Sequence, residues 1–426
     1  MQTNRRQFIR SAGVVGASAM LWGAEGKSEE TTPPPESLFD SYCVLQNPTE
    51  TSNSVTWTVT APATGWIEWG KSAEKLDQKA DGACFGLRPY DDQVITIPLS
   101  GLEPNTTYYY RAACAKVDFV HAYDVTTHQP EFSPVYSFTT PGKNTSGGSF
   151  AVMNDTHQHL ETLRLATAKL RELQADYTLW NGDLLNDIYD AKQVAQFIMK
   201  PADTPFAVEK PLLLVRGNHD HRGPWARNLP RYLTPWKHEN TPYSDLGYSY
   251  VVRHGDLALI GLDTGEDKPD FRREWAGLAS FEPYIARQGE WLAEVMATET
   301  VQTAPFIVVF CHIPLFDERP NANPGTLETG YSTWKKLAAD HWGATLQKHG
   351  VQLVVAAHVH AHRVDPPSES RCWTQITGGG PGAKQHATII HGTVQNGLLK
   401  IDVHDLFAAK IVTSLEIPPR KAVAVA

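Results

Sequence analysis

Cysteine, long apolar runs and excess positive charge are all scarce in this sequence of 426 residues. The five cysteines are odd in number, and no two of them have C-x-x-C spacing, which excludes a disulfide framework and a zinc ribbon. Three of the five fall in the N-terminal region, at Cys43, Cys84 and Cys114. One disulfide bridge there is compatible with an oxidising compartment, but the pairing stays open.

Apart from a short N-terminal stretch, no uninterrupted apolar run approaches the roughly 20 residues that span a bilayer, so no membrane span is expected in the mature chain. The formal net charge of −9 argues against a nucleic-acid-binding surface. A nucleotide substrate stays open, because a metal site supplies positive charge locally. Charged residues make up 20% and hydrophobic residues 41%, which excludes wholesale disorder, and the length predicts two domains.

The first 24 residues resemble a twin-arginine export signal. Arg5 and Arg6 precede a short, weakly apolar segment at 12–22 that glycines interrupt. We therefore expect export to the periplasm or the cell exterior, against the alternative of a chance arginine pair on a disordered tail. The cleavage site stays open. Residues 25–37 are polar and rich in proline, which predicts a linker.

Residues 38–141 consist of short alternating runs rich in β-branched and aromatic residues, at 54–60, 65–69, 93–97, 107–111 and 135–139. This pattern predicts an all-β sandwich. The segment from Leu102 to Arg111 resembles the loop that enters a late strand of fibronectin type III domains. In those domains a tyrosine packs at the corner and its hydroxyl bonds back to the chain.

A second linker at 142–148 separates this module from residues 149–418, where the pattern changes. Apolar strands at 150–154, 177–180, 306–310 and 351–355 alternate with segments of helical periodicity, for example around Leu163 and Leu170. Alternating helices and strongly apolar strands predict an α/β domain with a buried sheet.

Five apolar strands in this region run directly into polar residues. They end in Asp155 and His157, Asp183, Asn218, His312, and His358 and His360. Ligands of open α/β sheets bind just beyond the carboxyl ends of strands, so these side chains are expected to converge on one pocket. A single histidine after a strand is more often structural. The ordered set of five segments therefore carries the prediction.

The residue types predict which ligand the pocket binds. Imidazole, carboxylate and amide groups without a thiolate suit Zn, Mn or Fe. Seven ligands are too many for one tetrahedral zinc but suit two ions that share a carboxylate. His358 and His360 would point in opposite directions on an extended strand, so a loop is expected there.

In this order, the five segments resemble the signature blocks of the calcineurin-like metallophosphoesterases, over about 150–415. With the preceding β module, the layout is similar to that of purple acid phosphatases and their bacterial relatives. The resemblance implies a two-sheet β-sandwich flanked by helices. It also implies two metal ions, with Asp183 as the bridge. The first ion would be bound by Asp155, His157 and His360, and the second by Asn218, His312 and His358.

Three positions depart from the family pattern. Purple acid phosphatases have a tyrosine ligand where this chain has Asn186, and they lack the histidine present here as His157. Both departures predict a nearly colourless protein. The last block usually opens with glycine, where this chain has Ala357, which would be strained if the position required a positive φ.

The resemblance implies hydrolysis of phosphate mono- or diesters by attack of a metal-bridging hydroxide. His219 would stabilise or protonate the leaving alkoxide, with Asp220 holding its ring and favouring the charged form. Asn218 would help to stabilise the phosphoryl charge, and Arg216 and Asn186 are candidate substrate contacts. A structural ion pair is the alternative for Arg216. Further candidates, for which a structural role is equally expected, are His159, His221, His362 and the glycine run at 378–380.

Two other functions stay open. A metal-binding or adhesion module could use the same fold as a scaffold, although no expected ligand is missing. A protein phosphatase is the second alternative, which export disfavours. The expected partner is a small-molecule phosphate ester, and the oligomeric state stays open.

Overall fold

The computed structural model describes residues 37–317 and 331–420, with 331–335 as backbone only. The predicted export signal at 1–24, and the predicted linker at 25–37 except its last residue, lie outside the described residues. The described chain from Ser37 onward belongs to one compact unit. Within it, no helix combines the length and the apolar character needed to cross a membrane.

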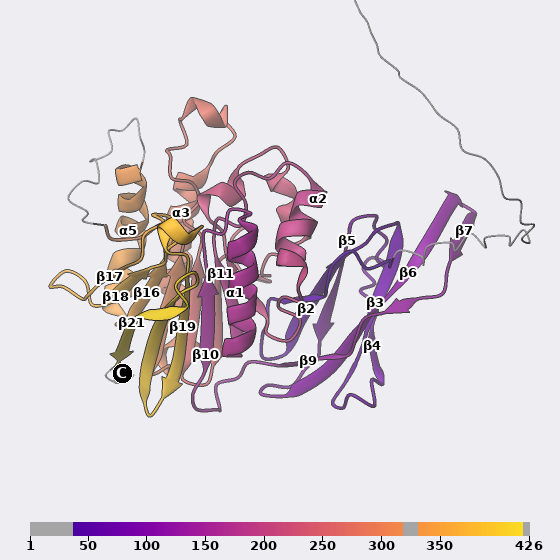
Figure 1. Ribbon diagram of the computed structural model, residues 1–426, viewed down its shortest axis with the longest axis horizontal. Helices are drawn as coiled ribbons and strands as arrows, with labels where there is room; N and C mark the ends of the chain where they lie inside the picture. The colour runs from indigo at the N-terminus through magenta and orange to yellow at the C-terminus, as the bar shows by residue number, and fades with distance from the viewer. Residues whose placement is uncertain (1–36, 318–330, 421–426) are drawn as a thin grey trace, which may run out of the picture. The chain divides into compact units, whose positions relative to one another are not determined.

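The N-terminal part is a β module of two facing sheets (Figure 1). One sheet contains β1 (Val44–Gln46), β2 (Ser52–Thr58) and β5 (Val94–Ser100). The other contains β4 (Gln78–Ala80), β3 (Ala63–Gly70), β6 (Thr107–His121) and β7 (Asp124–Thr127), and β8 (Glu131–Phe132) and β9 (Tyr136–Thr139) also pair with β6. The strand predicted at 107–111 is thus the start of a much longer one.

Aromatic side chains fill the space between the two sheets. Trp57, Tyr108 and Tyr110 are fully buried there. The Tyr108 hydroxyl accepts a hydrogen bond of 2.9 Å from the backbone N–H of Glu103. The N-terminal β domain of the prediction is therefore confirmed at the level of an all-β module.

The remainder is an α/β domain with two central sheets. The first contains β10 (Ser149–Met153), β11 (Tyr177–Asn181), β12 (Leu212–Val215), β19 (Thr388–Gln395), β20 (Leu398–Asp405) and β21 (Lys410–Ile417). The second contains β13 (Tyr250–His254), β14 (Leu257–Leu262), β15 (Phe306–Cys311), β16 (Leu353–Ala356), β17 (Arg363–Asp365) and β18 (Thr374–Thr377). A largely apolar core lies between them, and the central strands β11, β12, β14, β15 and β16 are buried on both faces.

Helices cover the outer faces of both sheets (Figure 1). On the first sheet lie α1 (Leu160–Leu173) and α2 (Ala191–Val194), and α1 buries Leu163 and Leu170 as its periodicity predicts. On the second lie α3 (Phe281–Met296), α4 (Glu299–Gln302) and α5 (Tyr331–Lys348). The predicted two-sheet sandwich flanked by helices is confirmed.

One sheet runs through both parts of the chain. Strand β1 of the N-terminal module pairs in parallel with β12, which joins β1, β2 and β5 to the first sheet. The Gln46 side chain reinforces the joint by donating to Tyr232 O at 2.8 Å and accepting from Thr234 N at 2.9 Å. Strands β1, β2 and β5 of the N-terminal module thus extend the first sheet of the α/β domain.

Candidate metal centre

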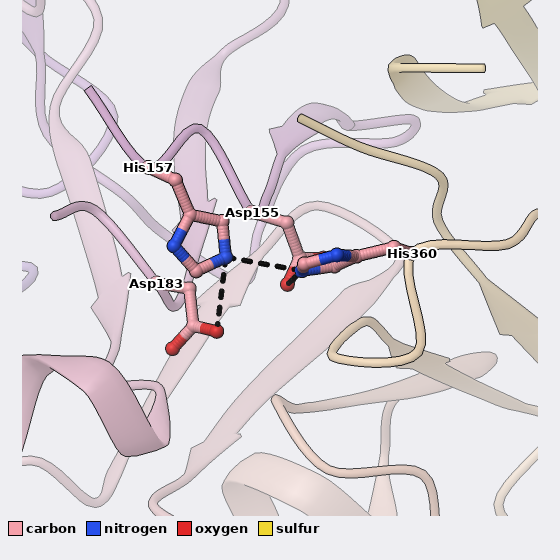
Figure 2. A group of neighbouring side chains, drawn as sticks. All are labelled: Asp155, His157, Asp183 and His360. Atoms are coloured by element: carbon pink, nitrogen blue, oxygen red, sulfur yellow. Dashed lines mark hydrogen bonds and ion pairs between the residues drawn. The ribbon is translucent and has the colours of Figure 1, made fainter. Parts of the chain in front are cut away.

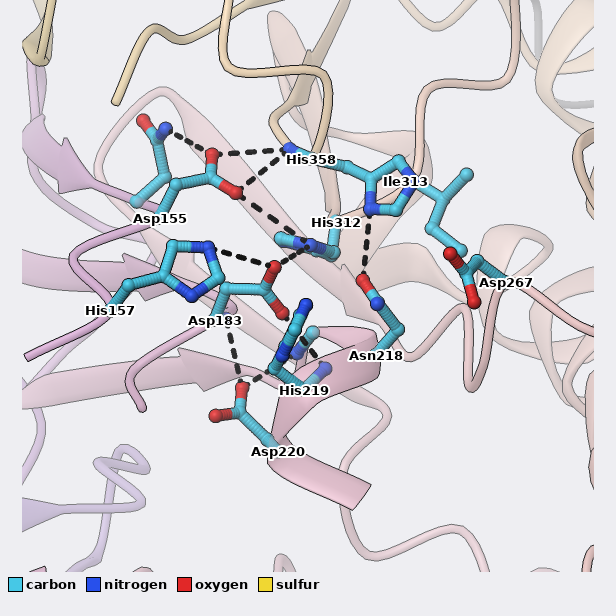
Figure 3. A network of polar contacts seen from close by, with 12 residues as sticks. Asp155, His157, Asp183, Asn218, His219, Asp220, Asp267, His312, Ile313 and His358 are labelled. Carbon is cyan, nitrogen blue, oxygen red and sulfur yellow. Dashed lines mark hydrogen bonds and ion pairs between the residues drawn. The ribbon is translucent and has the colours of Figure 1, made fainter. Parts of the chain in front are cut away.

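The seven predicted ligand side chains come together where the strands of both sheets end (Figures 2 and 3). Strands β10, β11 and β12 are parallel in one sheet, and β15 and β16 are parallel in the other, so their carboxyl ends share an edge. Two groups of ligand atoms form there, each within 4.8 Å of one another. The first comprises Asp155, His157, Asp183 and His360, and the second comprises Asp183, His312 and His358.

In the first group, two imidazoles face two carboxylates (Figure 2). His157 Nε2 lies 3.0 Å from His360 Nε2 and 3.4 Å from Asp183 Oδ2. His360 Nε2 lies 3.3 Å from Asp155 Oδ1. The carboxylate oxygens offer lone pairs, and Nε2 of each histidine does so when the ring is neutral with its proton on Nδ1, so the four groups can bind one ion together.

The second group is completed by an amide. His312 Nε2 lies 3.2 Å from Asp183 Oδ2, and His358 Nδ1 lies 2.8 Å from Asn218 Oδ1 (Figure 3). Asp183 Oδ2 thus lies close to a histidine of each group. This is the placement that a bridging carboxylate requires.

The spacing of these atoms fits metal coordination. Ligand atoms at about 2.1 Å from one ion are about 3.0 Å apart at octahedral corners and about 3.4 Å apart at tetrahedral corners. Four of the separations, between 3.0 and 3.4 Å, match this range, and all ligand atoms of each group lie within 4.8 Å of one another. His312 Nε2 is fully buried and faces the Asp183 carboxylate, so a cation between the two atoms would satisfy both. The residues present therefore fit two metal ions.

Charge at the site is balanced between carboxylates and imidazoles. Burial alone would raise the pKa of Asp183, but His312 and His157 hold that pKa well below its ordinary value. Burial alone would lower the pKa of His312, but Asp183 and Asp155 raise it to about 10. The carboxylates and imidazoles of the site thus stabilise each other's charged forms.

Hydrogen bonds behind the ligands set their orientation. His312 Nδ1 donates to Asn181 O at 2.9 Å, which leaves its Nε2 lone pair for a metal. The Asn181 side chain in turn donates to Cys311 O at 3.1 Å and Val355 O at 3.3 Å, which ties β11 to the opposite sheet. On the other side, Asn154 Nδ2 donates to Asp155 Oδ2 at 2.6 Å.

Two glycines make room for the ligands. A Cβ atom on Gly182 would lie 2.3 Å from His312 Nδ1, and one on Gly217 would lie 2.3 Å from Asp183 Oδ1. The glycine run at 378–380 also borders the site, since a Cβ on Gly380 would lie 2.9 Å from Asp155 O. These glycines allow the strand-end loops to approach each other closely.

The backbone turns sharply at five of the seven ligand positions. Positive φ angles occur at Asp155 (46°), His157 (45°), Asp183 (52°), His358 (68°) and His360 (52°). Non-glycine residues rarely adopt this region, and such conformations are concentrated at functional sites. The two turns around Val359 bring both flanking imidazoles to the site, as the sequence required.

Comparisons with known proteins agree with this geometry. Residues 148–362 match the family described as "Calcineurin-like phosphoesterase", and residues 40–140 match the "Purple acid Phosphatase, N-terminal domain". The chain belongs to the calcineurin-like phosphoesterase family. Purple acid phosphatase 22 from Arabidopsis thaliana is 26% identical over 306 residues, which cover 70% of this chain and 60% of that protein. Phosphoenolpyruvate phosphatase from Allium cepa is 24% identical, over 72% of this chain and 59% of that protein.

The chain thus spans about 60% of the length of these two curated relatives. Among solved structures, a purple acid phosphatase from yellow lupin (Lupinus luteus) seeds has a TM-score of 0.58 at 16% identity, covering 88% of this chain and 73% of that one. PhoD has a TM-score of 0.59 at 13% identity, covering 90% of this chain and 94% of that one. These two structures share the fold.

One expectation drawn from the phosphoesterase family is wrong: Asp220 does not hold the His219 ring. Its buried carboxylate instead accepts backbone N–H bonds from Gly217 at 2.8 Å, and from Asp183 and Leu184 at 3.0 Å each. Asp220 thereby fixes the loops that carry two ligands. A carboxylate is the natural acceptor for three converging N–H groups, and the sequence pattern could not locate those donors.

The His219 ring has other partners. It lies 4.8 Å from the His157 ring, beside the metal-ligand groups. Its Nδ1 lies 2.5 Å from Asn186 O and its Nε2 lies 3.0 Å from Arg222 Nη1, so Nδ1 donates and Nε2 accepts. Burial and Arg222 lower the pKa of His219, which favours the neutral ring over the predicted charged form.

The residues predicted to contact substrate have contacts within the protein. Arg216 forms a buried ion pair of 2.6 Å with Asp263, which is the structural alternative, and Asn186 meets His219 through its backbone carbonyl. The three further histidines have structural partners: His159 accepts from Thr162 N, His221 lies 3.3 Å from Asp263 Oδ1, and His362 contacts Thr377 O. Ala357 has no positive φ, so the strain expected there is absent.

Sequence reasoning missed Arg222 and its two carboxylate partners. Arg222 Nε and Nη2 donate to Glu266 at 2.7 and 2.8 Å, and Nη2 also lies 2.9 Å from Asp267 Oδ1. A sixth apolar strand, β14, could have indicated these residues in the sequence, because it ends just before Asp263, Glu266 and Asp267. It is parallel to β15 and delivers its polar residues to the same edge.

Proposed function

We propose that this protein is an exported dinuclear-metal phosphoesterase that hydrolyses phosphate mono- or diesters. One observation carries the proposal. Asp183 Oδ2 lies 3.4 Å from His157 Nε2 and 3.2 Å from His312 Nε2, as a carboxylate between two ions must. Membership of the calcineurin-like phosphoesterase family supports the same function.

The seven ligands divide between two sites. Asp155, His157 and His360 would bind the first ion and Asn218, His312 and His358 the second, with Asp183 shared. Ions of Fe, Mn or Zn suit this donor set, and when bound they would polarise the phosphoryl group and activate water. With Asn186 in place of a tyrosine ligand, no tyrosinate-to-iron colour is expected.

The chain's own contribution to bond cleavage centres on His219. Its Nδ1 contact with Asn186 O fixes the ring and leaves Nε2 beside Arg222 Nη1. Arg222 would stabilise the leaving oxygen by donating an N–H. His219 would protonate that oxygen from the charged form of the ring, in which Nε2 carries a proton and no longer accepts from Arg222. Positioned proton transfer contributes about 10²–10⁴ to the rate.

The substrate class rests on the relatives. Several are named as phosphatases, one of them as a phosphoenolpyruvate phosphatase, which favours a small phosphomonoester, although the same metal core serves diesters. The paired arginines near the N-terminus support export, and the Tyr108 corner supports a fibronectin type III-like N-terminal module.

The test combines elemental analysis with hydrolysis of a matched aryl phosphate monoester and diester. Two equivalents of metal with turnover are expected, and the preferred ester defines the subclass. His219→Ala should keep both metals while turnover falls most on esters with poor leaving groups. Loss of metal in that variant would refute the role of His219. A wild-type protein that holds two metals but hydrolyses neither ester would instead favour the scaffold alternative.

A further inference from the structure

A cavity of about 540 Å³ lies beside the turn that carries His219 and Asp220. One wall is formed by Asp187, His221 and Arg222, and the other by Lys268, Trp275 and Phe281 of the segment that follows β14. A second cavity of about 380 Å³ shares His221, Arg227, Leu278 and Phe281 with the first. The two cavities are therefore adjacent along this segment, and together they are called the hollow.

Arg222 connects the hollow with His219. Arg222 lines the first cavity, and its Nη1 lies 3.0 Å from His219 Nε2. Arg222 thus belongs both to the wall of the first cavity and to the contact with His219, which places this cavity one side chain away from the proposed proton donor. The cavity of about 590 Å³ lined by Asp40, Leu160 and Lys192 includes no residue of this turn, and none of the three cavity linings includes a proposed metal ligand.

The walls offer aromatic surface. Trp275 is half-buried and is held by a hydrogen bond of 3.2 Å from its indole N–H to Pro269 O. Phe281 packs edge-on against the His221 ring, with centroids 4.8 Å apart. Leu278 lies between the two cavities with 70% of its surface exposed. Such a lining favours a flat, apolar ring.

The cations of the hollow differ in how they are neutralised. Arg222 and Lys268 are paired with Glu266 and Asp267 at 2.5–2.9 Å. Arg227, in contrast, has no carboxylate within ion-pair distance among residues 37–317 and 331–420. Its guanidinium makes one long contact of 3.5 Å to Leu278 O. It is thus available to an anionic group in the hollow.

We infer that this hollow is the leaving-group subsite, and that it takes an aromatic alcohol carrying a second anionic group. Trp275 contacts the ring and Arg227 pairs with the anionic group, so both act as specificity-determining residues. This inference rests on the proposed phosphoesterase function and names the class of ester that the site prefers.

The test uses the metal-loaded full chain with 4-nitrophenyl phosphate and its ring-carboxylated counterpart. In Arg227→Gln, the ratio of kcat/KM for the carboxylated ester to that for the plain ester should fall by about 10-fold to 100-fold, as for a lost charged hydrogen bond. The matched control is Arg273→Gln, an exposed arginine of the same segment outside both linings, which should leave the ratio unchanged. An unchanged ratio in Arg227→Gln overturns the inference.

A binding measurement separates this inference from the proposed function. Calorimetry with the carboxylated nitrophenol, the product alcohol, needs no turnover. Arg227→Gln should bind it at least about 10-fold more weakly, and Trp275→Leu should weaken binding of both nitrophenols. Arg227-dependent binding without hydrolysis would support the subsite and overturn the proposed function. If the protein hydrolyses the esters but wild type and Arg227→Gln bind the carboxylated nitrophenol equally well, the proposed function is supported and the subsite is overturned.

Discussion

Replacing Gly182 with alanine should abolish binding of the second metal ion while the first is retained. The added Cβ would lie 2.3 Å from His312 Nδ1, so the ring must retreat by about 1 Å to reach ordinary van der Waals contact. A bond from Nε2 to a metal is about 2.1 Å long and does not survive such a shift. Disturbing only the support of a ligand costs about 10- to 100-fold in metal affinity. Removing the ligand itself should therefore cost at least about 100-fold.

The assay is calorimetric titration of metal-stripped protein with Mn²⁺ or Zn²⁺, followed by elemental analysis. Gly182 has a positive φ of 79°, so alanine adds backbone strain to the clash. Gly397→Ala is the matched control, because Gly397 has a φ of 76° but no heavy atom within 4 Å of the added Cβ. The control should bind two equivalents. Two equivalents bound with wild-type affinity by Gly182→Ala would refute the assigned second site.

Three further changes have defined outcomes. Asp220→Asn should destabilise the protein by about 1–3 kcal/mol in urea unfolding, because one of three converging N–H groups loses its acceptor; unchanged stability would contradict this. Burial would raise the pKa of Asp263, but Arg216 and His221 hold that pKa well below the ordinary value. The ionised Asp263 therefore contributes its full share of the folding stability above about pH 4, and this share is lost as the pH falls further. Asp263→Asn should therefore flatten the acid limb of a pH–stability profile, and an equally steep limb would exclude this pair as its source. His157→Asn should leave the metal-free protein no less stable, since asparagine tolerates a positive φ better than histidine, but it should lower the metal content. A loss of more than about 1 kcal/mol in the stability of the metal-free variant would contradict the argument from backbone strain.

The sequence predicted the positions of the ligands because each follows a strongly apolar strand. The strands at 306–310 and 177–180, for example, were recovered within one residue as β15 and β11. Parallel strands buried on both faces leave only their ends for polar side chains. The polar residues after them therefore had to meet at one edge.

Contacts between those loops were not predictable in the same way. Asp220 is adjacent to His219 in sequence, yet its partners are N–H groups of a loop 36 residues away and of Gly217. Arg222 reaches His219 because both lie on one tight turn, and its carboxylate partners come from the segment after β14. The length of β6 and the pairing of β1 with β12 likewise depend on tertiary packing. Local patterns contain none of this information.

The backbone conformation of the site bears on whether the fold serves as a catalyst or as a scaffold. Five of the seven proposed ligands have positive φ angles, at a cost of roughly 1–2 kcal/mol per residue, against a typical total stability of about 5–15 kcal/mol. In a non-catalytic scaffold, glycine or asparagine at the same positions would reduce this backbone strain. Aspartate and histidine at the site bring carboxylates and imidazoles within 3.2–3.4 Å of each other, which is favourable only when protons or cations compensate the carboxylate charge. The same strain that weakens the metal-free chain thus places Asp183 between two histidines, and metal binding recovers the stability that the turns cost.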